Sequence, residues 1–239
     1  MSGAKPALVV VPTFNERDNL PVLIDGLLQI PSLSVLVVDD GSPDGTGNVA
    51  DALAREHPDR ISVLHRTGRP GLGLSYIDGL RHALTTGVPL VCQMDADLSH
   101  SPADLPRLLA AAEHSDLVIG SRYVAGGRIR NWPLHRRLLS AFANRYIRAI
   151  TGLGIRDGTS GFRCWRREAL EQIPFDRILS DSYAFLVELA WETASRGSRI
   201  AEVPITFVER RQGVSKLSAL TLVESAKLPW RLASRGRLR

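Results

Sequence analysis

The chain is poor in cysteine and has no long apolar run, and each absence excludes a class of protein. Only 2 of its 239 residues are cysteine, and neither Cys92 nor Cys164 has a Cys-x-x-Cys or Cys/His companion, so we expect no zinc site. The longest apolar runs, such as residues 7–12, are far shorter than the roughly 18 residues that a membrane-spanning helix needs. The N-terminus has no apolar segment of the kind that secretory signals carry. These absences predict a cytoplasmic protein.

What the chain does have is an ordinary globular composition with unevenly distributed charge. Hydrophobic residues make up 44% and charged residues 23%, as in a folded domain. Two basic stretches, 122–148 and 210–239, together carry +14, so within a net charge of +5 the remainder is near −9. This asymmetry is compatible with a solvated surface, but it also indicates an anionic partner. The tryptophans are too scattered to stack nucleic-acid bases, so a phosphorylated ligand or an anionic bilayer is favoured over nucleic acid.

The first 120 residues alternate apolar runs with amphipathic stretches. Five runs are continuously apolar, as in strands that are covered on both faces of a parallel sheet. They are residues 7–11, 34–38, 61–64, 90–94 and 117–120. Apolar residues at helical spacing lie between them. This order predicts an α/β fold with a doubly wound, mostly parallel central sheet flanked by helices.

The pattern changes after Gly120. A loop rich in glycine and arginine, 124–131, leads into a predicted helix from about Leu134 to Ile150 with an arginine-rich polar face. The further expected elements are an extended segment at 159–166, a helix at 183–196, and short strands at 200–203 and 205–208. No linker divides the chain, so we expect one domain over residues 1–216 and a basic helical extension over 217–239.

Polar and acidic residues follow the predicted strands, where ligands bind in open parallel sheets. These segments are 12–16, 39–46, 65–66, 95–97 and 121–123. A single aspartate at such a place often only caps the next helix, and Asp44 and Asp104 are candidates for that role. Several acidic loops at one edge exceed what capping requires, so we expect a binding site there.

Asp95 and Asp97 alternate on a segment predicted to be extended. Their carboxylates therefore point the same way and can approach one divalent ion. Mg²⁺ or Mn²⁺ fits such a pair, because these ions complete their shell with water and substrate phosphates, which indicates a nucleotide diphosphate. The sequence has no Walker motif, and residues 68–73 lack the spacing of a dinucleotide fingerprint, which disfavours NTPases and Rossmann dehydrogenases.

Taken in order, these segments resemble the family 2 glycosyltransferases of GT-A fold. The matching motifs are Val-Val-Pro-Thr-Phe-Asn-Glu at 10–16, Val-Val-Asp-Asp-Gly-Ser-Pro-Asp-Gly-Thr at 37–46, His-Arg-Thr-Gly-Arg-Pro-Gly-Leu-Gly at 65–73, Asp-Ala-Asp at 95–97, Gly-Ser-Arg-Tyr at 120–123, Thr-Ser-Gly-Phe-Arg at 159–163 and Gly-Val-Ser-Lys-Leu at 213–217. Over about residues 7–217 the chain is similar, more narrowly, to the polyprenol (dolichol) monophosphate mannose synthases. The resemblance implies an inverting transfer of mannose from GDP-mannose to a polyprenyl (dolichyl) phosphate, with Mg²⁺ or Mn²⁺.

The resemblance also implies a role for each residue at a matching position. The nucleotide pocket is implied for Pro12, Phe14, Glu16 and Asp40, with Asp39 and Arg66 as supporting neighbours. Phe14 stands where a tyrosine is more usual. Metal and diphosphate binding is implied for Asp95 and Asp97, and Ser99 stands where related synthases often have a glutamine. Arg210 and Lys216 match a loop that closes over the donor phosphates.

Arg122, Arg136 and Ser140 match the acceptor-phosphate positions, and with Asp97 they form the expected catalytic set. A phosphate acceptor is already an anion, so its attack on the sugar needs positioning and charge stabilisation rather than a strong base. Arg136 and Ser140 are four residues apart and share one side of the predicted helix. The remaining arginines of that helix are interpreted as solvated, and the histidines as core or surface residues.

The C-terminal segment has the pattern of an interfacial helix. Its apolar positions are Leu217, Leu220, Val223, Ala226, Trp230 and Ala233, and its basic ones are Lys227, Arg231, Arg235, Arg237 and Arg239. Pro229 is expected to bend or end the helix. We expect a peripheral protein at the cytoplasmic face of a membrane, held by an anionic surface or by a membrane-anchored partner protein; a helix packed on the sheet is the alternative.

Two other functions stay open at this stage. The same fold could use UDP-glucose or UDP-N-acetylglucosamine as the donor, because no residue identifies the base or the sugar. A non-catalytic phospholipid-binding subunit that kept the fold is the second alternative.

Overall fold

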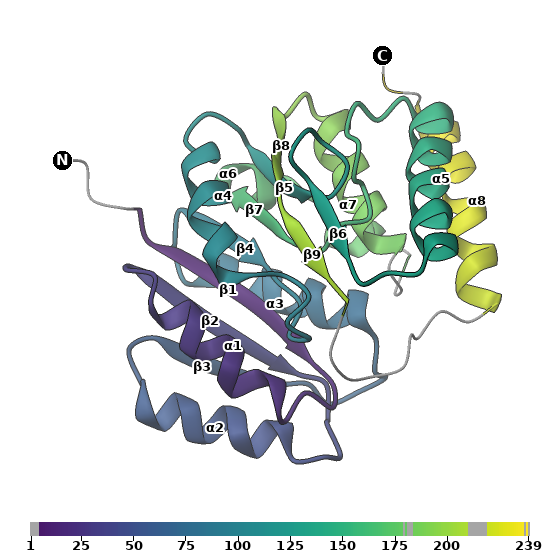
Figure 1. The fold of residues 1–239 in the computed structure, drawn as a ribbon. Coiled ribbons are helices and arrows are strands. Elements are labelled where there is room, and N and C mark those ends of the chain that lie inside the picture. Colours follow the sequence, from purple (N-terminus) through teal and green to yellow (C-terminus); the bar gives the residue numbers. More distant parts are fainter. Residues whose placement is uncertain (1–4, 179, 181–183, 210–218, 237, 239) are drawn as a thin grey trace.

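A seven-stranded sheet forms the centre of the protein (Figure 1). The computed structural model describes residues 5–178, 180, 184–209, 219–236 and 238, with the backbone alone for 219–225. The strand order is β3-β2-β1-β4-β7-β5-β8. The strands are β1 (Ala7–Thr13), β2 (Leu33–Asp39), β3 (Ile61–His65), β4 (Leu90–Gln93), β5 (Leu117–Ser121), β7 (Arg163–Arg166) and β8 (Ile200–Pro204). β7 is antiparallel to β4 and β5, and the other pairs are parallel.

Helices cover both faces of the sheet. On one face lie α1 (Asn19–Leu28), α2 (Thr46–Glu56) and α4 (Leu105–Ala111), and on the other lie α3 (Leu72–Thr85), α6 (Arg167–Glu171) and α7 (Ala184–Ser195). Successive strand residues point to opposite faces, so Val9 and Val11 belong to one core and Leu8 and Val10 to the other. Both cores need apolar residues, which explains the continuous apolar runs. The predicted doubly wound α/β fold is confirmed.

A two-stranded ribbon lies beside the sheet. β6 (Arg128–Arg130) pairs in parallel with β9 (Thr206–Val208), so the glycine- and arginine-rich segment predicted as a loop contains a strand. The Val208 N–H donates to the Ser99 carbonyl at 3.1 Å, and the Glu209 N–H to the Arg130 carbonyl at 3.2 Å. The ribbon therefore binds to the segment that follows β4. The structure also contains two short 3₁₀ helices, η1 (Pro102–Asp104) and η2 (Phe175–Arg177).

Helices α5 (Leu134–Thr151) and α8 (Ala219–Arg235) lie side by side at one end of the molecule (Figure 1). Leu228 and Leu232 of α8 are buried in the core that contains α7, whereas Ala226 and Trp230 are exposed. The segment thus packs on helices α5 and α7 rather than on the sheet. In the described part of the chain, no helix is long and apolar enough to cross a membrane.

The C-terminal segment decides between the two alternatives for Pro229 only in part. α8 continues past Pro229 to Arg235, so the proline does not end the helix, and a bend at this residue stays a prediction. Arg235, predicted as a basic position of the interfacial helix, instead faces α7, because its Nη1 lies 3.2 Å from Glu192 Oε1 and 3.6 Å from Glu188 Oε1. The positions predicted at Leu217, Arg237 and Arg239 lie outside the described residues, as do the side chains of Leu220 and Val223.

Candidate functional site

The loops that follow β1 and β2 are joined by hydrogen bonds at the carboxyl edge of the sheet. The Glu16 N–H donates to Thr46 Oγ1 at 3.0 Å, and that hydroxyl donates to Asp44 Oδ1 at 2.6 Å. Asp44 Oδ2 accepts from the Arg17 N–H at 3.2 Å. Partial burial alone would raise the pKa of Asp44, but the hydrogen bonds from Thr46 and Arg17 outweigh it and lower the pKa. Asp44 thus shapes the loop, whereas the N-cap of the following helix is Gly45 rather than the predicted Asp44.

The two predicted nucleotide-site aspartates after β2 have different surroundings. Asp39 is buried and accepts hydrogen bonds from the hydroxyls of Thr13 at 3.1 Å and Ser42 at 2.6 Å. Both of these hydrogen bonds reach Asp39 Oδ1 and hold the loop after β2 against β1. Asp40 forms an ion pair with Arg66 and accepts a hydrogen bond from the Gly71 N–H at 2.7 Å.

Arg66 links the second and third strands of the site. Besides Asp40, its Nε donates to Asp78 Oδ2 at 2.7 Å. Pro12, predicted to line the nucleotide pocket, is buried within β1. Phe14 and Glu16 are partly exposed in the loop that follows this strand. The structure thus brings these predicted residues to one edge of the sheet.

The loop after β4 presents Asp95 and Asp97, both partly exposed. The Tyr76 hydroxyl donates to Asp95 Oδ1 at 2.7 Å, and the Ser99 N–H donates to Asp97 Oδ1 at 3.1 Å. Leu98 has a φ of 62°, in the left-handed region that leucine rarely adopts. The chain therefore turns sharply after the second carboxylate, and such backbone conformations are concentrated at functional sites.

The loop that contains Asp95 and Asp97 offers few side-chain ligands, which suits a metal ion that takes most of its ligands from water and substrate. Ser99 Oγ and His100 Nδ1 are buried and, among the described residues, have no hydrogen-bond partner. Burial lowers the pKa of His100, although Asp95 and Asp97 act in the opposite direction. The described residues contain no group of three or more His, Cys, Asp or Glu arranged to hold a metal. Two carboxylates completed by water and phosphate oxygens suit Mg²⁺ or Mn²⁺.

Arg122, at the end of β5, is held by a partner that the sequence did not indicate. Its Nε lies 2.8 Å from Asp157 Oδ2 and its Nη2 2.7 Å from Asp157 Oδ1, and Nη2 also donates to Thr159 Oγ1 at 2.8 Å. The Asp157 side chain is fully buried. Burial alone would raise the pKa of Asp157, but the Arg122 guanidinium outweighs it and lowers the pKa. Asp157 compensates the buried charge of Arg122, yet spacing in the sequence could not identify this acid.

Trp132 brings two of the predicted acceptor residues together. The Arg122 Cζ lies 5.6 Å and the Arg136 Cζ 4.4 Å from the centre of its indole ring. Arg136 also pairs with Glu209, with 2.8 Å between Nη1 and Oε1. The sequence interpretation missed both Trp132 and Glu209. The two guanidinium groups, each paired with a carboxylate, thus form one arginine cluster around this indole ring.

Ser140, the third predicted acceptor residue, lies one turn beyond Arg136 on α5. Asn144 ties this helix to the arginine cluster, because its Nδ2 lies 3.1 Å from the Ser140 carbonyl and 3.1 Å from Thr159 Oγ1. The arginine cluster also lies near the loop that contains Asp95 and Asp97. Both of these aspartates, and also Arg122 and Asp157, are close enough to His100 to influence its pKa. Arg210 and Lys216, predicted to close over the donor, lie outside the described residues.

Comparisons with known proteins identify relatives along nearly the whole chain. Residues 8–174 match the sequence profile described as Glycosyl transferase family 2. The polyprenol monophosphomannose synthase of Mycolicibacterium smegmatis is 48% identical over 233 residues, which are 97% of this chain and 88% of that protein. The undecaprenyl-phosphate mannosyltransferase of Micrococcus luteus is 47% identical over 231 residues, 95% of each chain.

Solved structures give the same fold at lower identity. The glucosyl-3-phosphoglycerate synthase of Mycobacterium tuberculosis, crystallised with Mn²⁺, UDP-glucose and phosphoglyceric acid, aligns with a TM-score of 0.69 over 96% of this chain and 78% of its own, at 21% identity. A non-catalytic role is set aside, because the chain belongs to glycosyl transferase family 2 and is a glycosyltransferase.

Proposed function

We propose that the protein transfers mannose from GDP-mannose to a polyprenyl phosphate and so makes a lipid-linked mannose. The observation that carries the proposal is the similarity, over almost the entire chain, to two proteins named for mannosyl transfer to polyprenol or undecaprenyl phosphate. The geometry supports it, since an arginine cluster suited to an anionic acceptor lies next to a carboxylate loop suited to a nucleotide diphosphate. The cytoplasmic, membrane-peripheral location expected from the sequence belongs to the same proposal.

The reaction follows from the charges of the site. An oxygen of the acceptor phosphate attacks the anomeric carbon of mannose, the bond from that carbon to the donor's diphosphate breaks, and the electron pair leaves on the diphosphate. No proton has to be removed from the acceptor, so positioning and charge stabilisation carry the catalysis. Arg136 and Ser140 bind the acceptor phosphate, and Arg122, fixed by Asp157, supplies positive charge beside it.

The donor side is assigned to the loops after β1, β2 and β4. Asp40, Phe14 and Glu16 bind the nucleoside. Asp95 and Asp97 would hold Mg²⁺ or Mn²⁺, which neutralises charge on the leaving diphosphate when bound. The structurally similar synthase crystallised with Mn²⁺ and UDP-glucose supports this arrangement. Arg210 and Lys216 remain candidates for closing over the donor.

A comparison of donors tests the proposal. The full chain is incubated with a short-chain polyprenyl phosphate, Mn²⁺ and radiolabelled GDP-mannose, UDP-glucose or UDP-N-acetylglucosamine, and label in the organic phase is counted. We expect GDP-mannose to give at least tenfold more product than either UDP-sugar. UDP-glucose as the better donor would favour the alternative that the synthase with bound UDP-glucose suggests.

Combined replacement of Arg136 and Ser140 by alanine should raise the KM for the acceptor by about 10- to 100-fold, the loss that a charge-assisted hydrogen bond to phosphate predicts. The KM for GDP-mannose should change by less than about threefold, because the nucleotide loops are separate. Arg137→Ala is the matched control, since this neighbouring guanidinium is exposed. Equal effects on both substrates would show that these residues do not bind the acceptor.

A further inference from the structure

The outer side of α5 is apolar, which reverses the pattern of an ordinary surface helix. Leu134, Leu138 and Phe142 are four residues apart and therefore share one side of the helix. They are 68%, 61% and 65% exposed. The packed side carries the polar residues Asn144 and Thr151, both buried next to Ile147. A helix on a water-facing surface normally turns its apolar side inward, so the outer side of α5 is suited to an apolar environment.

Trp230 of α8 extends this apolar side. It is 63% exposed, and its indole N–H donates to the Tyr146 hydroxyl at 2.9 Å. The Tyr146 ring in turn stacks on Phe142, with 6.3 Å between the ring centres. Of the six large apolar side chains exposed in the described part of the chain, five lie on these two helices. We call them the α5–α8 surface: Leu134, Leu138, Leu139, Phe142 and Trp230.

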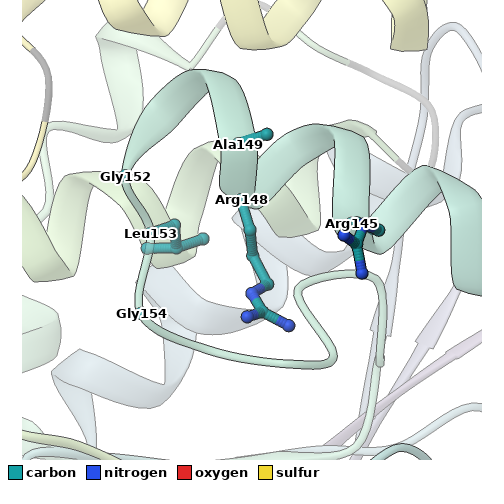
Figure 2. A pocket seen from close by; sticks show the side chains of 6 residues that line it. All are labelled: Arg145, Arg148, Ala149, Gly152, Leu153 and Gly154. Atoms are coloured by element: carbon teal, nitrogen blue, oxygen red, sulfur yellow. The ribbon is translucent and has the colours of Figure 1, made fainter.

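Positive charge borders the α5–α8 surface. Arg145 and Arg148 extend from α5 into an open pocket of about 430 Å³ beside residues 152–154 (Figure 2). α5 contains no acidic residue, and no carboxylate among the described residues pairs with either guanidinium. An apolar helix side flanked by arginines, with tryptophan and tyrosine at its edge, is the combination that binds anionic lipid bilayers.

The inner side of the same helix contributes to the candidate site. Arg136 and Asn144 face the cluster that contains Trp132 and Thr159. If Arg136 holds a polyprenyl phosphate, as the proposed function requires, the apolar tail of that acceptor has to leave the site toward lipid. A bilayer at the outer side of α5 would lie one helix away from the phosphate.

We propose that the α5–α8 surface docks on an anionic phospholipid bilayer. Leu138, Phe142 and Trp230 enter the interfacial layer, and Arg145 and Arg148 contact lipid phosphates. The docking rests on the exposed side chains of the two helices, and its link to the acceptor rests on the proposed function.

Vesicle sedimentation tests the docking. The full chain is mixed with vesicles of phosphatidylcholine and phosphatidylglycerol (7:3). We expect the double variant Leu138→Gln/Phe142→Gln to bind at least tenfold more weakly than the wild type. Val22→Gln, at a side chain that is 56% exposed on α1, is the matched control and should bind like the wild type. Arg145→Gln/Arg148→Gln should weaken binding to these vesicles and leave binding to pure phosphatidylcholine unchanged.

Three results would overturn the docking proposal: no vesicle binding by the wild type, unchanged binding by the double variant, or an equal loss in Val22→Gln. A wild-type dimer that the double variant converts to a monomer, seen by sedimentation velocity without vesicle binding, would identify the surface as a contact between two copies. Circular dichroism melting verifies that each variant is folded.

Activity separates this proposal from the proposed function. The double variant should transfer mannose normally to a water-soluble short-chain polyprenyl phosphate, but at least tenfold more slowly to a long-chain acceptor embedded in vesicles. Transfer to neither acceptor by the wild type would refute the proposed function, and vesicle binding would still decide the docking. Equal activity of variant and wild type on the embedded acceptor would show that docking does not deliver the substrate.

Discussion

Replacing Asp97 with asparagine should lower mannose transfer by about 100- to 1,000-fold, the loss expected when one element of a preorganised electrostatic site is removed. Asparagine keeps the shape of the side chain and removes the charge that, in our proposal, holds the ion on the donor diphosphate. Asp97 is partly exposed and lies in a loop outside the core, so the melting temperature of the variant should stay close to that of the wild type. Transfer from radiolabelled GDP-mannose and thermal melting measure the two effects.

The control for this variant is Asp104→Asn. Asp104 belongs to η1, seven residues further along the same connection, and its carboxylate pairs with Arg107 at 2.5 Å. The control removes the same charge from the same region and should retain activity. Two results would refute the metal role of Asp97: full activity of the wild type in excess EDTA, or similar losses in the two variants.

The sheet and its binding edge were predictable because they depend on local patterns. Continuous apolar runs identify strands that are buried on both faces, and parallel strands bring the residues that follow them to one edge. Asp40 after β2 and Asp95 after β4 therefore lie at the edge of the sheet where the sequence predicts the binding site. Arg136 lies on a helix outside this repeating pattern, so only the resemblance to the glycosyltransferase family identified it as a candidate site residue.

The partners of these residues were not predictable, because they come from distant parts of the chain. Asp157 lies 35 residues beyond Arg122, and Glu209 lies 73 residues beyond Arg136. No periodicity connects such positions. Only the folded arrangement of the β6–β9 ribbon, of α5 and of the loop that follows α5 brings them together.

The sequence also did not predict which sides of helices α5 and α8 pack against the rest of the protein. Periodicity locates α5 but does not reveal which of its sides packs, and the apolar positions Leu138 and Phe142 turned outward. For α8 the exposure of Ala226 and Trp230 agrees with the predicted interfacial side, but the prediction did not include Leu228 and Leu232, which pack in the core. The Tyr146 hydroxyl donates to the Ala226 carbonyl at 2.9 Å, in the turn before Pro229 where helical hydrogen bonding is weakened.

Asp157→Asn should destabilise the protein more than any other substitution considered, because it leaves the Arg122 guanidinium buried without its counter-charge. Breaking a buried ion pair from one side costs about 3–5 kcal/mol. For a domain of this size that corresponds to a melting temperature lower by roughly 6–20 °C. The further replacement of Arg122 by methionine should recover part of this loss, because the unpaired charge is removed as well. Asp176→Asn is the control, since its ion pair with Arg81 is exposed and should contribute little.

The effect of pH distinguishes loss of this ion pair from a general packing defect. The folded protein holds the pKa of Asp157 below the ordinary value of 3.8. The carboxylate therefore contributes its full stability above about pH 4, and this contribution is lost as the pH falls toward the lowered pKa. The difference in melting temperature between wild type and Asp157→Asn should be constant from pH 7 to pH 5 and become smaller below pH 4. A difference that persists unchanged at pH 3, or a variant that melts within 2 °C of the wild type at pH 7, would show that the charge of Asp157 does not hold Arg122 in place.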